Sequence, residues 1–225
     1  IDIEAATKLG IAVANVPGYC VNEVADHTMA LILASNRNVV RYDRKIREKK
    51  WDLEPGFPMK RLESQILGLL GFGKIPQYVA VRAQSFGLKV IAYDPYLTQE
   101  FAAKFNVRLV DLDELLASSD IISCHLPLTQ DTMGFIDRDK FDRMKKKPLF
   151  VNTSRGKVVN EQDLIEALEQ NKISAAALDV LSEEPPSFDS KLFEFDNVII
   201  TPHAGFYSET ALEEVRRRSA LNVRN

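Results

Sequence analysis

Three short segments in the second half of the chain carry side chains that could act on a small substrate. They are VNTSRGKVVNE, ALDVLSEEP and TPHAG, and they contain Arg155, Glu184 and His203. A guanidinium can bind a carboxylate through two parallel hydrogen bonds, and an imidazole can give or take a proton near neutral pH. Each residue alone could be a surface cation, one carboxylate of an acidic turn or a helix cap. Their order along the chain is what indicates a site.

A glycine-containing segment, ILGLLGFGKIPQYVA, precedes these motifs and has the pattern of a phosphate-binding turn. Gly71 would allow a tight turn after an apolar strand, and Gly73 would let backbone N–H groups approach a pyrophosphate at a helix N-terminus. Asp94 ends the next strand at the spacing where a carboxylate reaches the ribose hydroxyls, which predicts NAD rather than NADP. The alternative is a tight strand-to-helix turn without a ligand.

Pro76 occupies the position where this pattern has a third glycine. Proline is tolerated in the first turn of a helix, because the N–H group that it lacks would have no intrahelical acceptor there. Proline also disfavours the helical conformation of the preceding Ile75 and adds bulk against the strand. We expect the first effect to dominate, so that the loop still binds phosphate.

Short apolar runs alternate with helical segments from Leu62 onward, and these elements would position the candidate residues. Strands are expected at 66–70, 89–93, 121–124, 149–153, 175–180 and 198–201, and helices at 77–86, 99–105, 112–118, 138–146 and 160–171. Apolar runs without alternation are typical of strands buried on both faces of a parallel sheet. The pattern predicts a doubly wound α/β domain of the Rossmann type, which binds ligands at the carboxyl ends of its strands.

The flanking segments are more polar. Residues 1–17 begin with a helical pattern and run into a short apolar strand. The pattern then predicts one long helix over 21–50, a loop over 51–59 and, at the other end of the chain, a charged helix over 208–225. The chain starts with neither methionine nor a signal peptide, so we expect that it was cut from something longer.

Composition limits the class of protein. The 225 residues are 45% hydrophobic and 27% charged, which is ordinary for a globular chain. A net charge of −3 gives no basic footprint for nucleic acid or a membrane surface. No apolar run is long enough to span a bilayer. Cys20 and Cys124 lie far apart without clustered histidines, so we expect no disulfide, no metal site and a cytoplasmic location.

Taken together, these motifs resemble the D-isomer-specific 2-hydroxyacid dehydrogenase family. The resemblance covers nearly the whole chain, through DIEAATKLGIAVANVPG, NEVADHTMALILA, GLLGFGKI, YDPYL, HLPLTQDT, VNTSRGKVVNEQDLIEAL, ALDV…EEP and TPHAGFYSE. AYDPYL and PHAGFYSE are most similar to the branch of phosphoglycerate-dehydrogenase-like proteins that contains the C-terminal-binding-protein corepressors. The resemblance implies NAD as cofactor and hydride transfer between a D-2-hydroxy acid and its 2-oxo acid.

The resemblance also implies roles for individual residues. Arg155 would hold the substrate carboxylate, His203 would be the general acid–base, and Glu184 would pair with His203 and favour its protonated form. Asp179 would contact the nicotinamide carboxamide, and Thr28 could approach the pyrophosphate or nicotinamide. His27 and His125 fit no motif position and are interpreted as structural. The cofactor would be bound by Gly71, Phe72, Gly73, Lys74, Ile75, Asp94, Leu126, Pro127, Thr132, Thr153, Ser154, Arg155, Asp179, His203 and Gly205.

Finally, the resemblance implies a division of the chain and leaves two functions open. Residues 1–17 would be a remnant of a substrate-binding domain, 18–203 the NAD-binding domain, and 204–225 a helix returning toward the substrate domain. One function is an NAD-dependent dehydrogenase, in which this fragment alone would exclude water poorly. The other is an NAD-sensing, corepressor-like scaffold. Both would form a homodimer, with no direct contact to nucleic acid or membrane. The sequence does not identify the acid.

Overall fold

A single parallel sheet organises the chain. The computed structural model describes residues 2–51, 53 and 59–224, apart from the side chain of residue 224. The strands are β1 (Ile66–Leu70), β2 (Lys89–Tyr93), β3 (Arg108–Leu109), β4 (Ile121–Cys124), β5 (Leu149–Asn152), β6 (Ala175–Leu178) and β7 (Val198–Ile200). They pair in the order β3-β2-β1-β4-β5-β6-β7, and every pairing is parallel. The predicted doubly wound α/β sheet is confirmed.

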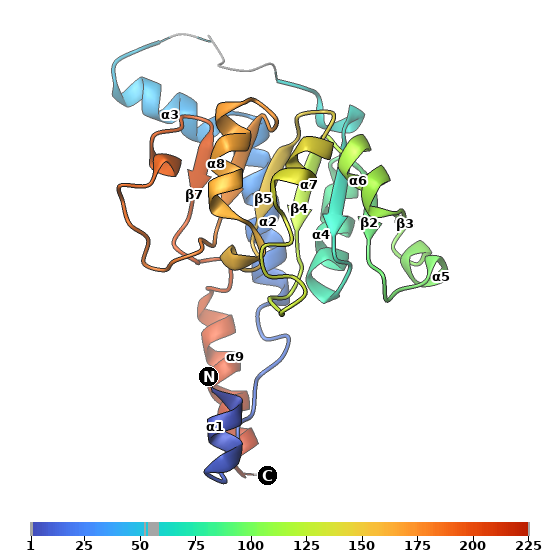
Figure 1. Cartoon of the computed structure of the whole chain (residues 1–225), viewed down its shortest axis with the longest axis vertical. Coiled ribbons are helices and arrows are strands. Elements are labelled where there is room, and N and C mark those ends of the chain that lie inside the picture. The colour runs from blue at the N-terminus through green and yellow to red at the C-terminus, as the bar shows by residue number, and fades with distance from the viewer. Residues whose placement is uncertain (1, 52, 54–58, 225) are drawn as a thin grey trace.

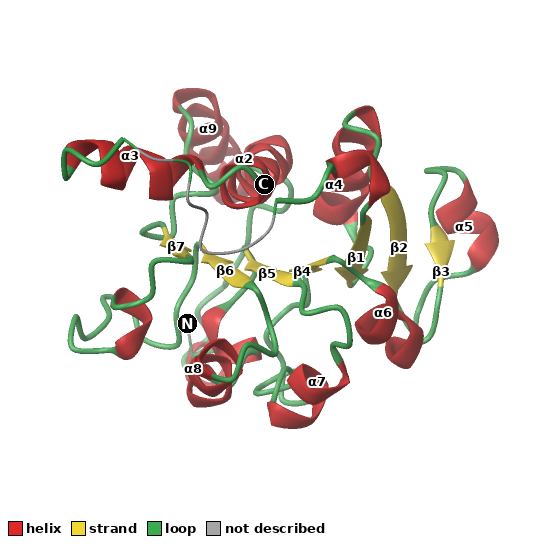
Figure 2. Ribbon diagram, turned by 90° about the horizontal axis from the view of Figure 1, so that it is seen from above, coloured by secondary structure: helices red, strands yellow, loops and turns green. Residues whose placement is uncertain are grey.

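Helices cover both faces of the sheet, as Figure 2 shows. One face carries α2 (Val21–Asn36), α3 (Val39–Arg47) and α4 (Lys74–Ser85). The other carries α6 (Leu112–Ser118), α7 (Arg138–Arg143) and α8 (Glu161–Glu169), while α5 (Gln99–Ala103) lies at the β3 end. The long helices have the apolar side that such packing requires, since Ala25, Met29 and Ile32 of α2 are buried.

Side chains from every strand except β3 enter two separate cores, one on either face of the sheet. Leu67 and Leu69 pack with α2 and α4, whereas Leu70 and Ile122 pack with α6, α7 and α8. Alternate residues of a strand point to opposite faces, so a strand covered on both sides needs apolar residues at every position. This requirement explains the unbroken apolar runs in the sequence.

The long helix predicted near the N-terminus is wrong. The single helix expected over 21–50 is two helices, because α2 ends at Asn36 and α3 begins at Val39. Asn38 lies between them with φ 53°, a left-handed conformation that asparagine tolerates better than most residues and that interrupts a right-handed helix.

Other boundaries agree more closely. The two-residue strand β3 was not predicted, and no strand forms in residues 11–16, where a short one was expected. The remaining strands and central helices lie within three residues of their expected bounds. Most of the loop expected at 51–59 lies outside the described residues.

Segments near the two ends of the chain contact each other beyond the sheet. Helices α1 (Ile3–Lys8) and α9 (Glu209–Arg224) extend together from one edge of the molecule (Figure 1). Asn222 donates a hydrogen bond to the carbonyl oxygen of Asn15 at 3.1 Å, and Arg218 donates one to that of Pro17 at 3.0 Å. Within the described residues, no helix has the length and apolar character needed to cross a membrane.

Candidate functional site

The candidate residues gather at one edge of the sheet because each follows the carboxyl end of a strand. The glycine loop follows β1, Asp94 follows β2, and the 126–132 loop follows β4. Arg155 follows β5, Glu184 follows β6 and His203 follows β7. Parallel strands end at the same edge, and β1 and β4 are the neighbours between which the strand order reverses. In Figure 1 this is the edge from which α9 extends.

The glycine loop has the geometry of a phosphate cradle. Gly71 has φ 85°, and a Cβ atom there would lie 3.2 Å from the carbonyl oxygen of His125, so a larger residue would be strained. Gly73 is the N-cap of α4, and a Cβ atom there would meet no atom within 4 Å. The first N–H groups of a helix have no intrahelical acceptor. Open space beside them therefore fits the pyrophosphate of a dinucleotide.

Asp94 is fixed against this loop. One carboxylate oxygen accepts a hydrogen bond from the Phe72 N–H group at 2.9 Å, and the other accepts one from the Tyr96 N–H group at 3.0 Å. A carboxylate has about four lone-pair positions, so acceptor capacity is left for ribose hydroxyls. The spacing predicted where Asp94 lies but not its hydrogen bond to the loop.

Pro76 is accommodated within the first turn of α4. The helix begins at Lys74 and continues through Ile75 and the buried Pro76 without interruption. Gln77 supports the turn, since its N–H group donates to the carbonyl oxygen of Gly73 at 3.3 Å and its side chain to that of Phe72 at 3.0 Å. The expectation that proline would not break this helix is confirmed.

His203 and Glu184 form a close pair. The His203 Nδ1 atom lies 2.7 Å from Glu184 Oε2, and Glu184 Oε1 accepts a hydrogen bond from the Leu181 N–H group at 3.1 Å. Their side chains are 41% and 36% exposed, so solvent reaches both. With Nδ1 bound to the carboxylate, Nε2 is the ring nitrogen available to a substrate.

Arg155 lies beyond the end of β5 with an exposed side chain. Its Nη1 donates to the carbonyl oxygen of Ser154 at 2.6 Å, and its own carbonyl oxygen accepts from Asn152 Nδ2 at 3.0 Å. In the part of the chain that the structure describes, no carboxylate forms an ion pair with it. The guanidinium is therefore able to bind an anionic substrate.

Thr153 and Ser154 connect Arg155 to the sheet. Thr153 is buried and its hydroxyl lies 2.9 Å from that of Thr28, while Ser154 donates to Asn152 Oδ1 at 2.8 Å. Thr28 has no exposed surface, and its hydroxyl also donates to the Val24 carbonyl oxygen at 2.7 Å. The expectation that Thr28 approaches the cofactor is therefore wrong, because its polar atom is enclosed by protein.

Asp179 anchors the turn that presents His203. Its carboxylate accepts hydrogen bonds from the Thr201 hydroxyl at 2.5 Å and from the N–H groups of Ala204 and Gly205 at 2.8 and 2.9 Å. His27 Nε2 lies 3.2 Å from the same carboxylate. Burial raises the pKa of Asp179, but the hydrogen bonds from His27, Thr201 and the turn outweigh it and hold the pKa below its usual value.

His27, interpreted from the sequence as structural, and Thr201, to which the sequence assigned no role, both belong to the hydrogen bonds that support this site. A Cβ atom at Gly205 would lie 2.8 Å from Asp179 Oδ2, so glycine is required there for a steric reason that the motif did not reveal. The signal for His27 was weak, because 174 residues separate it from Thr201.

The loop after β4 closes on itself. Thr132 donates to the carbonyl oxygen of Pro127 at 2.5 Å and accepts from the Thr129 N–H group at 2.8 Å, while Leu126 is nearly buried. Burial lowers the pKa of the preceding His125 to about 3, although part of the residue stays accessible. His125 Nε2 lies 2.9 Å from the Ser123 hydroxyl, in agreement with a structural role.

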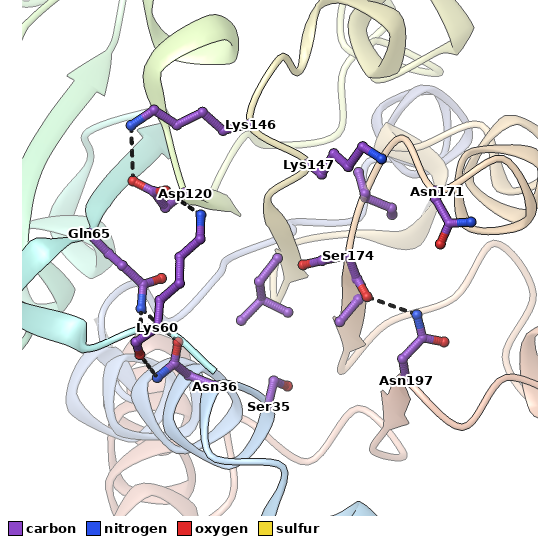
Figure 3. Close-up of a pocket in the computed structure, with 13 residues that line it drawn as sticks. Ser35, Asn36, Lys60, Gln65, Asp120, Lys146, Lys147, Asn171, Ser174 and Asn197 are labelled. Atoms are coloured by element: carbon purple, nitrogen blue, oxygen red, sulfur yellow. Dashed lines mark hydrogen bonds and ion pairs between the residues drawn. The ribbon is translucent and has the colours of Figure 1, made fainter. Parts of the chain in front are cut away.

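Two cavities lie at opposite edges of the sheet. One of about 570 Å³ is lined by Glu184 and His203 and by apolar residues of the 185–200 segment, including Phe188. The other, of about 440 Å³, lies at the amino edge (Figure 3). There Asp120 binds Lys60 at 3.0 Å and Lys146 at 3.1 Å. None of the candidate catalytic residues lines the second cavity, so the first is the one beside the chemistry.

Comparison with known proteins points to one family. Residues 29–205 match the family model described as D-isomer specific 2-hydroxyacid dehydrogenase, NAD binding domain. A D-3-phosphoglycerate dehydrogenase of Archaeoglobus fulgidus is 43% identical over 203 residues, which are 90% of this chain and 38% of that protein. A glyoxylate reductase of Korarchaeum cryptofilum is 40% identical over 99% of this chain and 67% of its own length.

Among solved structures, D-lactate dehydrogenase from Aquifex aeolicus, complexed with NAD and lactic acid, superimposes with a TM-score of 0.90. It is 32% identical, and the match covers all of this chain and 72% of that one. The chain spans only 38% to 40% of the length of the archaeal phosphoglycerate dehydrogenases that it matches.

Proposed function

Because the chain belongs to the D-isomer-specific 2-hydroxyacid dehydrogenase family, we propose that it is the NAD-binding part of an enzyme that interconverts a D-2-hydroxy acid and its 2-oxo acid. The observation that carries this proposal is the 2.7 Å contact between His203 Nδ1 and Glu184 Oε2, at the sheet edge where the glycine loop lies. A paired imidazole at such a position is suited to proton transfer.

His203 acts as the acid–base group. During reduction its Nε2–H group protonates the carbonyl oxygen of the 2-oxo acid, and during oxidation the neutral ring takes the hydroxyl proton. When bound, the nicotinamide supplies or accepts the hydride that completes the reaction. Glu184 fixes the ring through Nδ1, because a hydrogen bond to a carboxylate is stronger than one between neutral groups.

Arg155 binds the substrate carboxylate. Its guanidinium has no described ion-pair partner and presents a planar set of donors. Its attachment to Thr153 and Asn152 places those donors at the end of β5. A cation there neutralises the 2-oxo acid while His203 acts on the adjacent oxygen.

The glycine loop and Asp94 hold the dinucleotide. Gly73 faces open space beside the N-terminus of α4, which fits a pyrophosphate, and Asp94 lies beside the loop, where a 2′-phosphate would be repelled. The remaining cofactor contacts come from Lys74, Ile75 and from the loops that contain Leu126, Pro127, Thr132, Thr153 and Ser154. Asp179 already accepts hydrogen bonds from four groups, so its main role is to hold the 201–205 turn.

The ends of the chain belong to the substrate-binding side. Residues 1–17 and 204–225 are linked by hydrogen bonds from Arg218 and Asn222 of α9 to the carbonyl oxygens of Pro17 and Asn15, and α1 and α9 both extend beyond the sheet (Figure 1). A site of this kind excludes water by closure of two domains. We therefore expect these 225 residues alone to bind NADH better than they turn over substrate.

The test has two parts. Calorimetric titration of the chain should show tighter binding of NADH than of NADPH, and Asp94→Ala should reduce that difference. The full-length protein should reduce members of a panel of 2-oxo acids, and His203→Ala should remove most turnover while leaving NADH affinity within about threefold. Equal binding of both cofactors would contradict the role of Asp94. Tight NADH binding without turnover of any acid would favour the scaffold function instead.

A further inference from the structure

Helix α2 carries two adjacent polar side chains that reach the strand ends of the site. His27 and Thr28 lie in the first half of α2, among the buried apolar residues Val24, Ala25 and Met29. His27 reaches the residues that follow β6 and β7, and Thr28 reaches the residue that follows β5. Both contacts therefore lie directly behind the loops that carry His203 and Arg155.

The hydrogen bonds around His27 determine which ring nitrogen carries a hydrogen. The Thr201 hydroxyl gives its single proton to Asp179 Oδ1 at 2.5 Å, and a carboxylate can only accept. His27 Nε2 lies 2.9 Å from the same hydroxyl oxygen and 3.2 Å from Asp179 Oδ1. Neither of these oxygens can donate to the ring, so Nε2 must carry a hydrogen and donate to both.

The hydrogen bonds around Thr28 are directed in the same way. The Thr28 hydroxyl donates to the Val24 carbonyl oxygen at 2.7 Å, which uses its only proton. The hydroxyl of Thr153 lies 2.9 Å away and must therefore donate to Thr28. This bond is fully buried and ties α2 to the residue two positions before Arg155.

We infer that His27 and Thr28 are positioning residues that together set the placement of His203 relative to Arg155. His27 braces Asp179, whose carboxylate and carbonyl oxygens accept the N–H groups of His203, Ala204 and Gly205. Thr28 braces Thr153, which directly follows the neighbouring strand β5. Because both are adjacent on one rigid helix, they fix the separation of the two loops. This inference rests on the proposed function only for its effect on turnover.

The first test needs no substrate. In the isolated chain, amide hydrogen exchange of Ala204 and Gly205 should be at least about tenfold faster in His27→Phe, because the braced carboxylate that accepts both N–H groups is loosened. His27→Gln retains a donor near the Nε2 position and should restore exchange to within about threefold of the parent. His27→Asn has a donor that is too short to reach and should behave like His27→Phe, which keeps the test valid if one variant fails to fold.

A matched control lies on the same helix. Ser35 is also a buried polar residue of α2, but its hydroxyl has no hydrogen-bond partner among the described residues. Ser35→Ala should leave the exchange of Ala204 and Gly205 unchanged. Nitrogen-15 NMR of the parent should show hydrogen on His27 Nε2 at neutral pH.

The second test separates the two braces in the full-length protein. His27→Phe should lower kcat about tenfold with little change in KM for the 2-oxo acid, because it displaces the acid–base group. Thr28→Val should mainly raise that KM, because it displaces the residues that carry Arg155, and Thr28→Ser should restore it.

The inference would be overturned if amide exchange of Ala204 and Gly205 were unchanged in His27→Phe, or if His27→Gln did not restore it. It would also be overturned if NMR showed no hydrogen on His27 Nε2. Equal effects of the His27 and Thr28 variants on kcat and KM would also overturn it. If the parent turns over no 2-oxo acid, the proposed function fails, and amide exchange still decides the role of His27.

Discussion

His203 and Glu184 are both partly exposed, and this exposure determines what their pairing can do. Solvent screens the attraction between them, so the pair adds little to the stability of the fold. The pair instead determines the direction in which the imidazole ring points. Because Glu184 also accepts the Leu181 N–H group, its carboxylate is held in place rather than free to rotate.

Glu184→Gln should therefore lower the turnover of the full-length enzyme more than it changes cofactor binding. Glutamine can still accept a hydrogen bond from Nδ1, but a bond to a neutral amide holds the ring less firmly than a bond to a carboxylate, so kcat should fall about tenfold. Steady-state rates and calorimetric titration with NADH would measure both effects. Glu183→Gln, at the neighbouring carboxylate, is the matched control and should leave kcat unchanged. An unchanged kcat in Glu184→Gln would mean that another group holds the ring.

His125 should make the stability of the fold depend on pH. Burial lowers its pKa to about 3, so the folded protein leaves the ring neutral at pH values where the unfolded chain, with a pKa near 6.5, takes up a proton. The free energy of unfolding should thus fall as the pH drops below about 6.5, by up to about 1.4 kcal/mol per pH unit.

Urea unfolding at pH 7.0 and 5.5 would measure this loss of stability. His125→Gln removes the titrating ring but keeps a donor that can reach Ser123, so its stability should fall less between the two pH values. Equal losses in parent and variant would show that the partly accessible His125 is protonated in the folded state as well.

The sequence predicted the candidate residues that lie in motifs but not those that support them. Glu184 and His203 follow adjacent strands, so a parallel sheet brings them together whatever its details. His27 contacts Thr201 across 174 residues, and nothing local marks a histidine on an apolar helix as a hydrogen-bond donor to a distant strand. Such contacts depend on how α2 is rotated against the sheet, which side-chain packing decides.

Among the elements, the break between α2 and α3 could not be predicted from the spacing of apolar and polar residues. The change from apolar to basic residues in 21–50 was interpreted as one helix leaving the core. The segment in fact turns at Arg37 and Asn38, where a left-handed asparagine ends the regular pattern. Asparagine in a polar stretch carries only a weak signal, because the same residue also occurs on exposed helix surfaces.

Pro76 allows a prediction for α4. Because the helix runs through it without interruption, Pro76→Gly should tighten NADH binding by less than about tenfold, or 1.4 kcal/mol. Calorimetric titration of the parent, Pro76→Gly and Pro76→Ala would measure this, the alanine variant separating loss of the ring from added backbone freedom. A gain larger than tenfold in both variants would show that proline keeps the phosphate loop from its best geometry.

At the scale of the whole molecule, the alternation of apolar strands and helices predicted the parallel sheet, and the sheet predicted that all candidate residues share one edge. The class was predictable because burial on both faces leaves a clear pattern in each strand. The strand β3 was not predicted, because a two-residue edge strand, Arg108–Leu109, is too short to show an apolar pattern. The contact of α9 with Asn15 and Pro17 was not predicted either, because it joins segments near the two ends of the chain.

One surface of the molecule lacks a partner within the described chain. Helix α3 has no buried residue, and it exposes Val39 and Ile46, which precede the exposed Trp51 and Leu53. Exposed apolar side chains that follow one another this closely along the chain suit an interface between proteins. We expect the interface to be the two-fold contact of a homodimer, in which α3 of one protomer meets the same region of its partner.

Light scattering of the full-length protein at roughly 50 µM should therefore give the mass of a dimer. Ile46→Glu should shift the protein toward monomer, because it would bury a charge at the interface. Val223→Glu places the same charge on α9, where Val223 is 90% exposed and Ile46 on α3 is 47% exposed, and it should leave the mass unchanged. A monomeric parent, or equal dissociation by both variants, would show that α3 is not the surface through which protomers meet.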